Sequence, residues 1–201
     1  MPGDLLLSTA YLPPAEYFAY LKDSEQVYIE REESYIKQSY RNRCYIFTSN
    51  KIQILTVPVL LGSFHKTPLK DIRIDYSKRW QQVHLGAIIS SYGSSPFFLY
   101  YFDSIEKIIR AKYEFLLDLN TELLLALLTM TGIKCRLSYT TSFLPDKGMQ
   151  NDLRYRISPK KTSTYRTKKY LHVFTPEKGF IQGVSIIDLL FNTGPDAASF
   201  L

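Results

Sequence analysis

Three groups of polar residues in this sequence have the side-chain types and the spacing that chemistry requires. The first group lies where an expected strand ends and a helix begins, and it consists of Tyr11, Pro13 and Tyr17. Open α/β sheets bind ligands at such a turn, because backbone N–H groups and the positive end of the helix dipole meet there. A rigid turn with aromatic side chains in the core explains the same residues, so both interpretations stay open.

The second group surrounds an expected connection between two strands and combines acids, bases and an amide. Its members are Glu30, Glu32, Lys37, Arg41, Asn42 and Arg43. Carboxylate and guanidinium groups this close in the chain perturb each other's ionisation and can hold a polar ligand. A solvated network of charges accounts for them equally well. As a site, the group would supply catalytic carboxylates from Glu30 and Glu32 and ligand contacts from the other four.

The third group lies on one expected helix and contains Trp80, His84 and Tyr92. Trp80 and His84 are four residues apart and therefore share a helix face. His84 is the best candidate for a general base, because histidine is the side chain that titrates near neutral pH without perturbation. A single histidine on a helix is more often structural, and that alternative also stays open.

Standard catalytic signatures are absent from the sequence. It contains no glycine-rich dinucleotide fingerprint, no phosphate-binding Walker loop, no Gly-x-Ser-x-Gly elbow and no Cys-x-x-Cys pair. The three histidines, His65, His84 and His172, lie far apart without the spacing of metal ligands. We therefore expect no metal site, and the sequence leaves any cofactor unassigned.

The composition predicts a globular cytoplasmic protein. Of 201 residues, 45% are hydrophobic and 22% are charged, which excludes a wholly disordered chain. The two cysteines, Cys44 and Cys135, lie far apart and indicate reduced thiols in a reducing compartment. The N-terminus lacks the basic and apolar regions of a signal peptide. The longest uncharged stretch of the leucine-rich segment, 123–133, is too short for a membrane span, which needs roughly 20 apolar residues.

Positive charge is concentrated in one segment, 134–170. Ten basic residues and two acidic residues give it a charge of +8, whereas the rest of the chain carries −2. A solvated loop is one interpretation, because loops collect charge. A mobile flap that attracts a phosphorylated or otherwise anionic ligand is another. Tyr155, Tyr165 and Tyr170 interleave with the basic residues, as in some nucleic-acid-binding proteins, but no recognisable nucleic-acid motif supports that partner.

Hydrophobic periodicity predicts the elements that must position these residues. Leu5–Thr9 reads as a buried strand, the segment after Pro14 as a helix and Val27–Glu30 as a second strand, which together form a strand–helix–strand unit. Further along, the pattern predicts a hairpin of Cys44–Phe47 with Ile52–Val59 and a half-buried strand over Lys70–Tyr76. It then predicts a helix over Trp80–Tyr92, one long helix or two in series over Ile105–Thr131, and a returning strand over Cys135–Tyr139.

The whole chain, 1–201, is predicted to form one α/β domain with a mixed sheet flanked by helices. Residues 1–133 would be the core that carries the motifs, and residues 134–170 a long, flexible basic loop. Residues 171–201 would add a short strand, which begins at Tyr170 and runs to Phe174, and a helix over Ser185–Phe191. Ser185 and Asp188 have the spacing of a helix capping box.

The sequence resembles the WbqC-like family, which occurs with bacterial O-antigen and other surface-polysaccharide genes. Three stretches within residues 5–133 carry the resemblance, and the later segment 191–196 is similar to the ending of a subgroup with a longer C-terminal part. The stretches are Tyr11-Leu12-Pro13 with Tyr17-Phe18, Lys37 and Asn42-Arg43 running on to Leu55-Thr56-Val57-Pro58-Val59, and Trp80 with His84 through Tyr92 to Pro96-Phe97. The resemblance implies a cytoplasmic role around modified sugars or their carriers.

This chain departs from the family pattern at two places. Many members have His-Gln-Pro before the Tyr-Leu-Pro motif, where this chain has Leu7-Ser8-Thr9, and many have Asp-Asp after the second strand, where it has Arg31-Glu32. Chemistry based on those groups would be lost here, or moved to Glu30, Glu32 and His84.

Three functions from different classes follow from these observations. The first is a transferase that modifies a nucleotide-linked amino sugar, for instance by acylation, with His84 as general base, Glu30 or Glu32 orienting it, and 41–43 holding a phosphate or carbonyl group. The second is a non-catalytic protein that binds a sugar nucleotide or another phosphorylated small molecule, or assists a protein partner, since sixteen tyrosines suit sugars and interfaces. The third, a nucleic-acid-associated protein using 134–170, has the least support.

Overall fold

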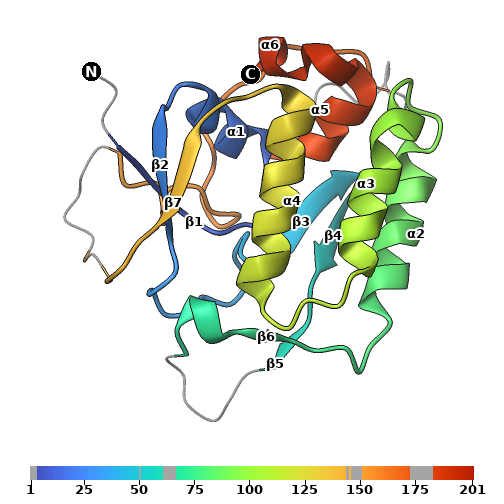
Figure 1. The fold of residues 1–201 in the computed structure, drawn as a ribbon. Helices are drawn as coiled ribbons and strands as arrows, with labels where there is room; N and C mark the ends of the chain where they lie inside the picture. The colour runs from blue at the N-terminus through green and yellow to red at the C-terminus, as the bar shows by residue number, and fades with distance from the viewer. Residues whose placement is uncertain (1–3, 50, 61–66, 144, 146–150, 173–182) are drawn as a thin grey trace.

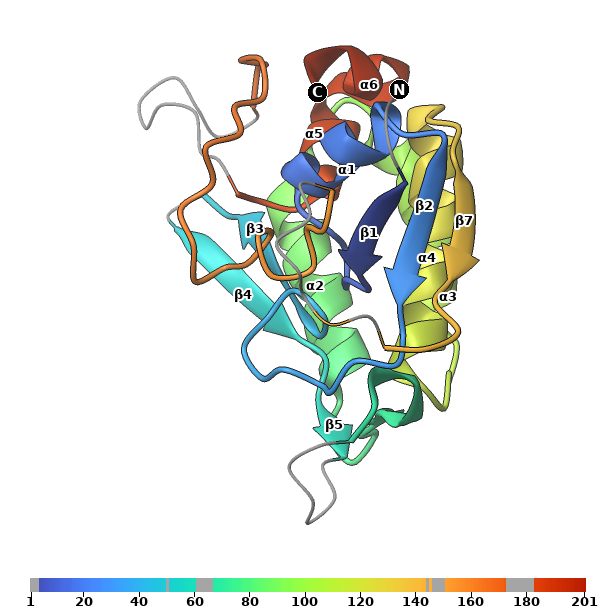
Figure 2. The same ribbon diagram turned by 90° about the vertical axis from the view of Figure 1, so that its left-hand side faces the viewer.

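A three-stranded parallel sheet lies at the centre of the protein in a computed structural model. The structure describes all residues except 1–3, 50, 61–66, 144, 146–150 and 173–182. The sheet consists of β1 (Leu5–Ser8), β2 (Gln26–Glu30) and β7 (Arg136–Tyr139) in the order β1-β2-β7 (Figures 1 and 2). Because all three strands run the same way, their carboxyl ends meet at one edge of the sheet.

The predicted strand–helix–strand unit is confirmed. Helix α1 (Ala15–Lys22) follows Pro14 directly and connects β1 with β2. Its buried face includes Tyr17, Phe18 and Leu21, which pack into the main hydrophobic core. All four residues of β1 are buried, as expected for a strand of a parallel sheet that is covered on both faces.

Antiparallel strands form two separate pairs in the described part of the chain, so the α/β class is confirmed but the single mixed sheet is not found. The predicted hairpin is present as β3 (Arg43–Phe47) and β4 (Ile52–Thr56). The second pair consists of β5 (Val59–Leu60) and β6 (Arg73–Ile74), two residues each.

The strand predicted over Lys70–Tyr76 is wrong for most of its length. A 3₁₀ turn, Leu69–Asp71, precedes β6, with the Asp71 N–H bonded to the Pro68 carbonyl at 3.0 Å. Pro68 starts this turn because its ring fixes φ at a value that suits a helical turn. The alternation nevertheless predicted the buried side correctly, since Ile72 and Ile74 both face the core.

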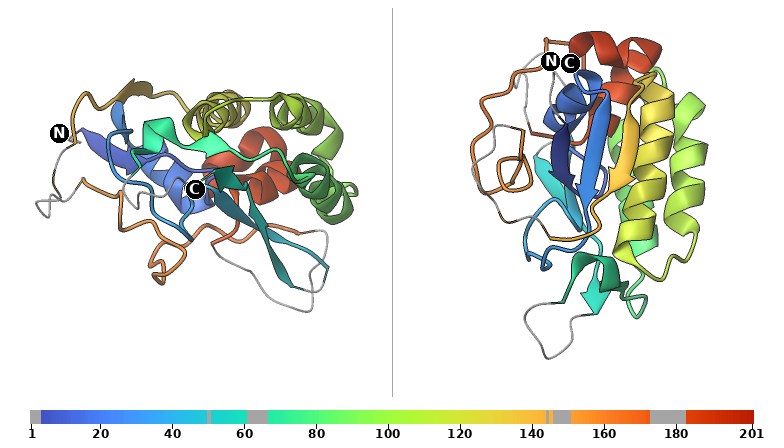
Figure 3. Two further views of the ribbon diagram at one scale, coloured as in Figure 1. Left: turned by 90° about the horizontal axis from the view of Figure 1, so that it is seen from below. Right: turned by 60° about the vertical axis from the view of Figure 1, so that its left-hand side comes forward.

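Three long helices follow, and the first, α2 (Trp80–Tyr92), has the predicted bounds. The next two are α3 (Phe98–Arg110) and α4 (Leu116–Thr131), which lie side by side (Figures 1 and 3), so the alternative of two helices holds. The break between them occurs because backbone groups at 114–116 bond to Ile72 and Ile74 beside β6 instead of continuing a helix. No helix in the described ranges is long and apolar enough to cross a membrane.

The C-terminal part contains α5 (Ile186–Thr193), a 3₁₀ turn (Gly194–Asp196) and α6 (Ala197–Phe200). The Ser185 side chain caps α5 by accepting a hydrogen bond from the Ile187 N–H, as predicted. Asp188 does not complete the capping box, because its carboxylate accepts hydrogen bonds from other elements. Of the strand predicted over Tyr170–Phe174, residues 170–172 form no strand and 173–174 lie outside the described residues.

The basic segment is more than a surface loop. Its beginning forms β7, and further on Leu153 and Arg154 are buried. The Leu6 N–H donates to the Asn151 carbonyl at 3.0 Å, and the Leu153 N–H donates to the Leu6 carbonyl at 2.9 Å. Residues 151–153 therefore cover the outer edge of β1, which the positive charge of the segment did not predict.

We predict opposite effects of alanine at two glycines. Gly132 ends α4 with φ = 69° and Gly86 lies within α2, and a Cβ at either position would meet no atom within 4 Å. Gly132→Ala should lower the free energy of unfolding by about 1 kcal/mol, because the left-handed conformation strains an L side chain. Gly86→Ala should raise it by about 0.5–1 kcal/mol through helix propensity. Urea unfolding measures both changes in the free energy of unfolding. Changes of the same sign in the two variants would contradict the conformations assigned to the two glycines.

Candidate functional site

Polar side chains gather at the carboxyl end of the parallel sheet, where β1 ends in Ser8 and β2 in Glu30. Close to Ser8, Arg41 and Glu33 form a buried bidentate ion pair, with Nε to Oε1 at 2.9 Å and Nη2 to Oε2 at 2.7 Å. The Ser8 hydroxyl donates to Glu33 at 2.7 Å and accepts from Arg41 at 2.7 Å. A buried pair of this kind fixes its geometry, because neither ion can exchange its partner for water.

A second buried ion network lies beside the first and centres on Arg154. Its Nη1 donates to Glu30 Oε2 at 2.9 Å, and its Nε donates to Asp152 Oδ1 at 2.9 Å. The other oxygen of Glu30 accepts from the Thr140 hydroxyl at 2.7 Å and from the Glu32 backbone N–H at 2.8 Å. The Arg154 and Glu30 side chains are 0% exposed. Both oxygens of the Glu30 carboxylate are thus engaged within the protein.

These two networks, which we call the carboxyl-edge cluster, comprise Ser8, Glu30, Glu33, Arg41, Thr140, Asp152 and Arg154. A cavity of about 10 Å³ adjoins the cluster, with Ser8, Tyr17, Tyr40 and Arg41 among its walls. That volume holds roughly one water molecule. This cavity is too small for a substrate.

A larger cavity of about 350 Å³ lies nearby and shares the Tyr40 wall. We call it the outer cavity. Its walls come from α1, from the chain around β3 and from residues 158–166, and they include Glu16, Tyr40, Tyr45, Ser163, Lys161 and Arg166. Figure 2 shows the segment after β7 (orange) passing beside α1 and β3. The size falls in the range of small-molecule sites, about 300–1,000 Å³.

The electrostatics of the outer cavity combine two cations with one unusual carboxyl group. Burial raises the pKa of Glu16 above its ordinary value, although a hydrogen bond with Ser163 and the charge of Arg156 oppose the shift. The rings of Tyr40 and Tyr45 meet edge to face with centroids 5.8 Å apart. A cavity with cations, aromatic rings, hydroxyls and a carboxyl of raised pKa can bind an anionic, ring-bearing ligand and exchange a proton with it.

Most of the residues predicted at the strand-to-helix turn and on α2 lie in the core instead. They hold elements together: the Pro13 carbonyl, for example, accepts from the Ile186 N–H at 2.8 Å. Tyr92 accepts from the Phe47 N–H at 3.1 Å and donates to Asp188 at 2.8 Å. The packing alternative considered for these residues therefore describes their contacts.

His84 is buried between aromatic rings. Its Nδ1 lies 2.9 Å from the Tyr11 hydroxyl, and the ring also hydrogen-bonds the Thr56 backbone. The Trp80 ring contacts it with centroids 5.1 Å apart. Burial lowers the pKa of His84 to about 4. A histidine that is 3% exposed and bonded on both sides suits a structural role better than the predicted role of general base, which needs contact with substrate.

The second predicted group is divided among the cluster, the core and the surface. Asn42 lies in the core, where its amide donates to the Val57 carbonyl at 2.8 Å. Glu30 and Arg41 belong to the carboxyl-edge cluster, and Tyr17 from the first group joins them by donating to the Ser8 carbonyl at 2.9 Å. Glu32 instead pairs with Lys70 at 2.7 Å on the surface, and the hydrogen bond from Lys70 lowers its pKa. Lys37 is exposed and Arg43 half-buried, and neither lines the outer cavity.

The sequence reasoning missed Glu16, Asp152, Arg154 and Lys161 as site residues. One signal was present: Asp152 is one of only two acids in the basic segment and is two residues from Arg154, with the apolar Leu153 between them. Such alternation favours an extended segment with Leu153 buried, and it places Asp152 and Arg154 on one side, where they can pair. Nothing local in the sequence marks Glu16, because an acid in the first turn of a helix is explained by the helix dipole.

The chain belongs to the WbqC-like protein family, whose model matches residues 9–168. Among known proteins it is similar to Uncharacterized protein Rv1507c of Mycobacterium tuberculosis, with 26% identity over 223 residues that cover 98% of this chain and 96% of the relative. No solved structure matches the chain. The family resemblance inferred from the motifs is thus confirmed, and the relative's name carries no activity.

We predict that removing the Arg154 charge strongly destabilises the fold. Arg154→Met leaves two buried carboxylates without their cation, which costs about 3–5 kcal/mol. The matched control is Arg110→Met, which breaks an exposed pair with Glu106 on α3 and should cost less than about 0.5 kcal/mol. Chemical denaturation measures both changes. A loss below about 1 kcal/mol for Arg154→Met would show that the cluster is not a buried ion network.

We predict that His84 stays neutral until the pH approaches 4. Its pKa in the folded state lies below the value of about 6.5 in an unfolded chain, so the unfolded state binds the proton first. The contribution of the neutral His84 ring to the stability of the fold is therefore complete above pH 6.5 and is lost as the pH falls toward 4. Comparing the pH dependence of stability with that of His84→Gln isolates the effect, and NMR titration of the ring measures the pKa. A ring that titrates near pH 7 would restore the general-base assignment.

Proposed function

We propose that this member of the WbqC-like family acts in the synthesis of surface polysaccharides such as O-antigen, and that it binds a nucleotide-linked amino sugar in the outer cavity. One observation carries the proposal: a cavity of suitable size unites Lys161 and Arg166 with the rings of Tyr40 and Tyr45 and the carboxyl of Glu16. A cytoplasmic location, expected from the sequence, belongs to the same proposal.

Each part of such a ligand has a matching group. The cations Lys161 and Arg166 suit a phosphate or diphosphate. Arg166 is positioned by hydrogen bonds from its Nη1 to the carbonyls of Ser163 and Tyr165, at 2.9 and 3.0 Å. The tyrosine pair offers ring faces and hydroxyls, which suit a sugar or a base.

The reaction that we propose is transfer of an acyl or aminoacyl group to the sugar amine, with an acyl thioester as the donor class. Glu16 replaces His84 as the proton acceptor, because it lines the cavity and because a raised pKa makes its carboxylate a stronger base. The amine nitrogen forms a bond to the acyl carbon, the thioester C–S bond breaks, and the amine proton passes through Glu16 to the leaving thiolate. The carboxyl-edge cluster, with Glu30 and Arg41, has a positioning role beneath the cavity.

A non-catalytic binding or accessory protein is the second candidate. The residues predicted to be catalytic, Glu30, Glu32 and His84, all bond to other groups of the protein, and this favours a protein without catalytic activity. A nucleic acid is the weakest candidate partner, and binding that fell steeply with added salt would favour it.

The binding proposal predicts a thermal shift that depends on one lysine. Sugar nucleotides are tested as probes beside free nucleotides, and a ligand at 100 times its dissociation constant should stabilise the fold by about 2.7 kcal/mol. Lys161→Gln should weaken binding about tenfold, because a charged hydrogen bond is lost. Its neighbour Lys160 does not line the cavity, so Lys160→Gln is the matched control and should bind like the parent.

Glu16→Gln separates the two candidate functions. A transferase should keep its affinity for the sugar nucleotide in this variant and lose turnover at least about a hundredfold, as expected when a general base is removed. Binding by the parental protein without turnover of any acyl thioester would favour the accessory protein. No thermal shift with any sugar nucleotide, or an equal loss of affinity in the Lys160 and Lys161 variants, would contradict the assignment of the cavity.

A further inference from the structure

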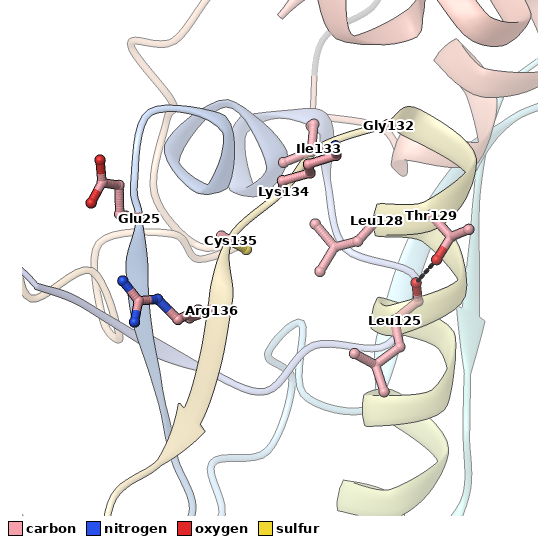
Figure 4. Close-up of a pocket in the computed structure, with 9 residues that line it drawn as sticks. All are labelled: Glu25, Leu125, Leu128, Thr129, Gly132, Ile133, Lys134, Cys135 and Arg136. Atoms are coloured by element: carbon pink, nitrogen blue, oxygen red, sulfur yellow. Dashed lines mark hydrogen bonds between the residues drawn. The ribbon is translucent and has the colours of Figure 1, made fainter.

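A cavity of about 640 Å³ lies at the opposite end of the sheet from the carboxyl-edge cluster. It is a groove between α4 and the start of β7, drawn in Figure 4. Leu128 and Ile133 form buried apolar walls, and Leu125 stands on the rim with 45% of its surface exposed. A groove between a helix and the edge of a sheet is a geometry in which an extended peptide can bind.

β7 is an edge strand that, in the described part of the chain, pairs only with β2. Its Arg136 N–H donates to the Glu25 carbonyl at 2.8 Å, and the N–H of Thr140 donates to the Ile29 carbonyl at 3.1 Å. Alternate residues of a parallel strand point their backbone groups to opposite sides. The N–H and C=O groups of Leu137 and Tyr139 therefore point outward, where another strand can accept and donate hydrogen bonds.

The two faces of β7 differ in chemistry. Tyr139 faces α4, since its hydroxyl lies 2.6 Å from the Thr121 hydroxyl, and Figure 4 shows the Cys135 sulfur on the same side. Ser138 lies on the other face, where it accepts from Gln26 at 3.1 Å, and the Arg136 side chain extends away from α4 in Figure 4. One face of the edge is thus apolar and the other basic.

The basic face is open to an anionic partner. Within the described ranges no carboxylate forms an ion pair with Lys134 or Arg136, and both residues are exposed. Glu25 also lines the groove, and Figure 4 shows its carboxylate on the same side as Arg136, but among the described residues it forms no ion pair with Lys134 or Arg136. An acidic side chain opposite Arg136 on an added strand would form a cross-strand pair of opposite charges, which stabilises strand pairing.

We propose that the free edge of β7 and the groove beside α4 bind an extended segment of a partner polypeptide that adds a fourth strand to the sheet. Successive residues of that strand point to opposite faces. Apolar side chains at alternate positions enter the groove lined by Leu125, Leu128 and Ile133, and acidic side chains between them face Lys134 and Arg136. This site is separate from the outer cavity and does not depend on the sugar-nucleotide proposal.

Charge argues for such a partner over a second copy of the chain. Two β7 strands paired about a two-fold axis would bring Lys134 and Arg136 of both copies to one face of a joint sheet. Like charges on neighbouring strands destabilise the pairing. An acidic strand removes this repulsion, and we therefore commit to it as the occupant.

The test is selection from a phage-displayed library of random peptides against the full chain, followed by affinity measurements on the enriched peptides. The key variant is Leu137→Pro, which removes an outward N–H that the β2–β7 ladder does not use, so the fold should persist. Leu137→Ala is the matched control, because it shortens the same side chain and keeps the N–H. Arg136→Glu reverses the charge at an exposed position, and it tests the same proposal if the proline variant does not fold.

We expect enriched peptides that alternate apolar and acidic residues. Binding should fall at least about tenfold in Leu137→Pro and in Arg136→Glu and be retained in Leu137→Ala. Bound peptide should also slow modification of Cys135 by a thiol reagent, since the other cysteine, Cys44, is fully buried. No enrichment, binders without acidic residues, or equal binding to Leu137→Pro would overturn the proposal. A dimer of the parental chain that Leu137→Pro abolishes in sedimentation would identify a second copy as the occupant and overturn it as well.

Discussion

The rest of the structure depends on the ion pairs of the buried Arg154 guanidinium group with Glu30 and Asp152. A cation removed from water must be matched by carboxylates, and Glu30 at the end of β2 and Asp152 supply them. This requirement draws residues 151–157 against the outer edge of β1, where Leu6 bonds to Asn151 and Leu153. Residues 158–166, which follow directly, then form a wall of the outer cavity. The geometry of the candidate site thus depends on a charge that no ligand would touch.

The elements that follow from local pattern could be predicted, whereas those that depend on distant partners could not. The bounds of α2 and the opening strand–helix–strand unit come from periodicity within a dozen residues. The pairing of Glu30 with Arg154 joins residues 124 positions apart, and no local pattern encodes it. The same limit explains why the strand predicted over Lys70–Tyr76 is mostly wrong. The alternating pattern shows which residues are buried, but the length of the strand depends on where its distant partners, β5 and the 111–115 connection, lie.

Residue type alone does not determine which side chain can act as a base. Histidine is the best base by its ordinary pKa, yet burial beside Tyr11 and Trp80 moves His84 out of the useful range. Burial acts in the opposite direction on a carboxylic acid, and it raises the pKa of Glu16 above its ordinary value. In the proposed reaction the role of base therefore passes from His84 to Glu16 through one physical effect. The size of that effect depends on tertiary packing, which a sequence without a structure does not show.

The two outer edges of the parallel sheet differ in what covers them. The edge of β1 is covered by residues 151–153, but the described residues leave the edge of β7 unpaired. An exposed edge invites pairing with other chains, and proteins limit this with short strands and charged side chains. β7 has both protections, since it has four residues and carries Arg136 just after Lys134. Like charges on a second β7 would repel these side chains, and in our proposal the same charges attract an acidic strand. Protection against self-association and selection of the proposed partner would therefore arise from the same two side chains.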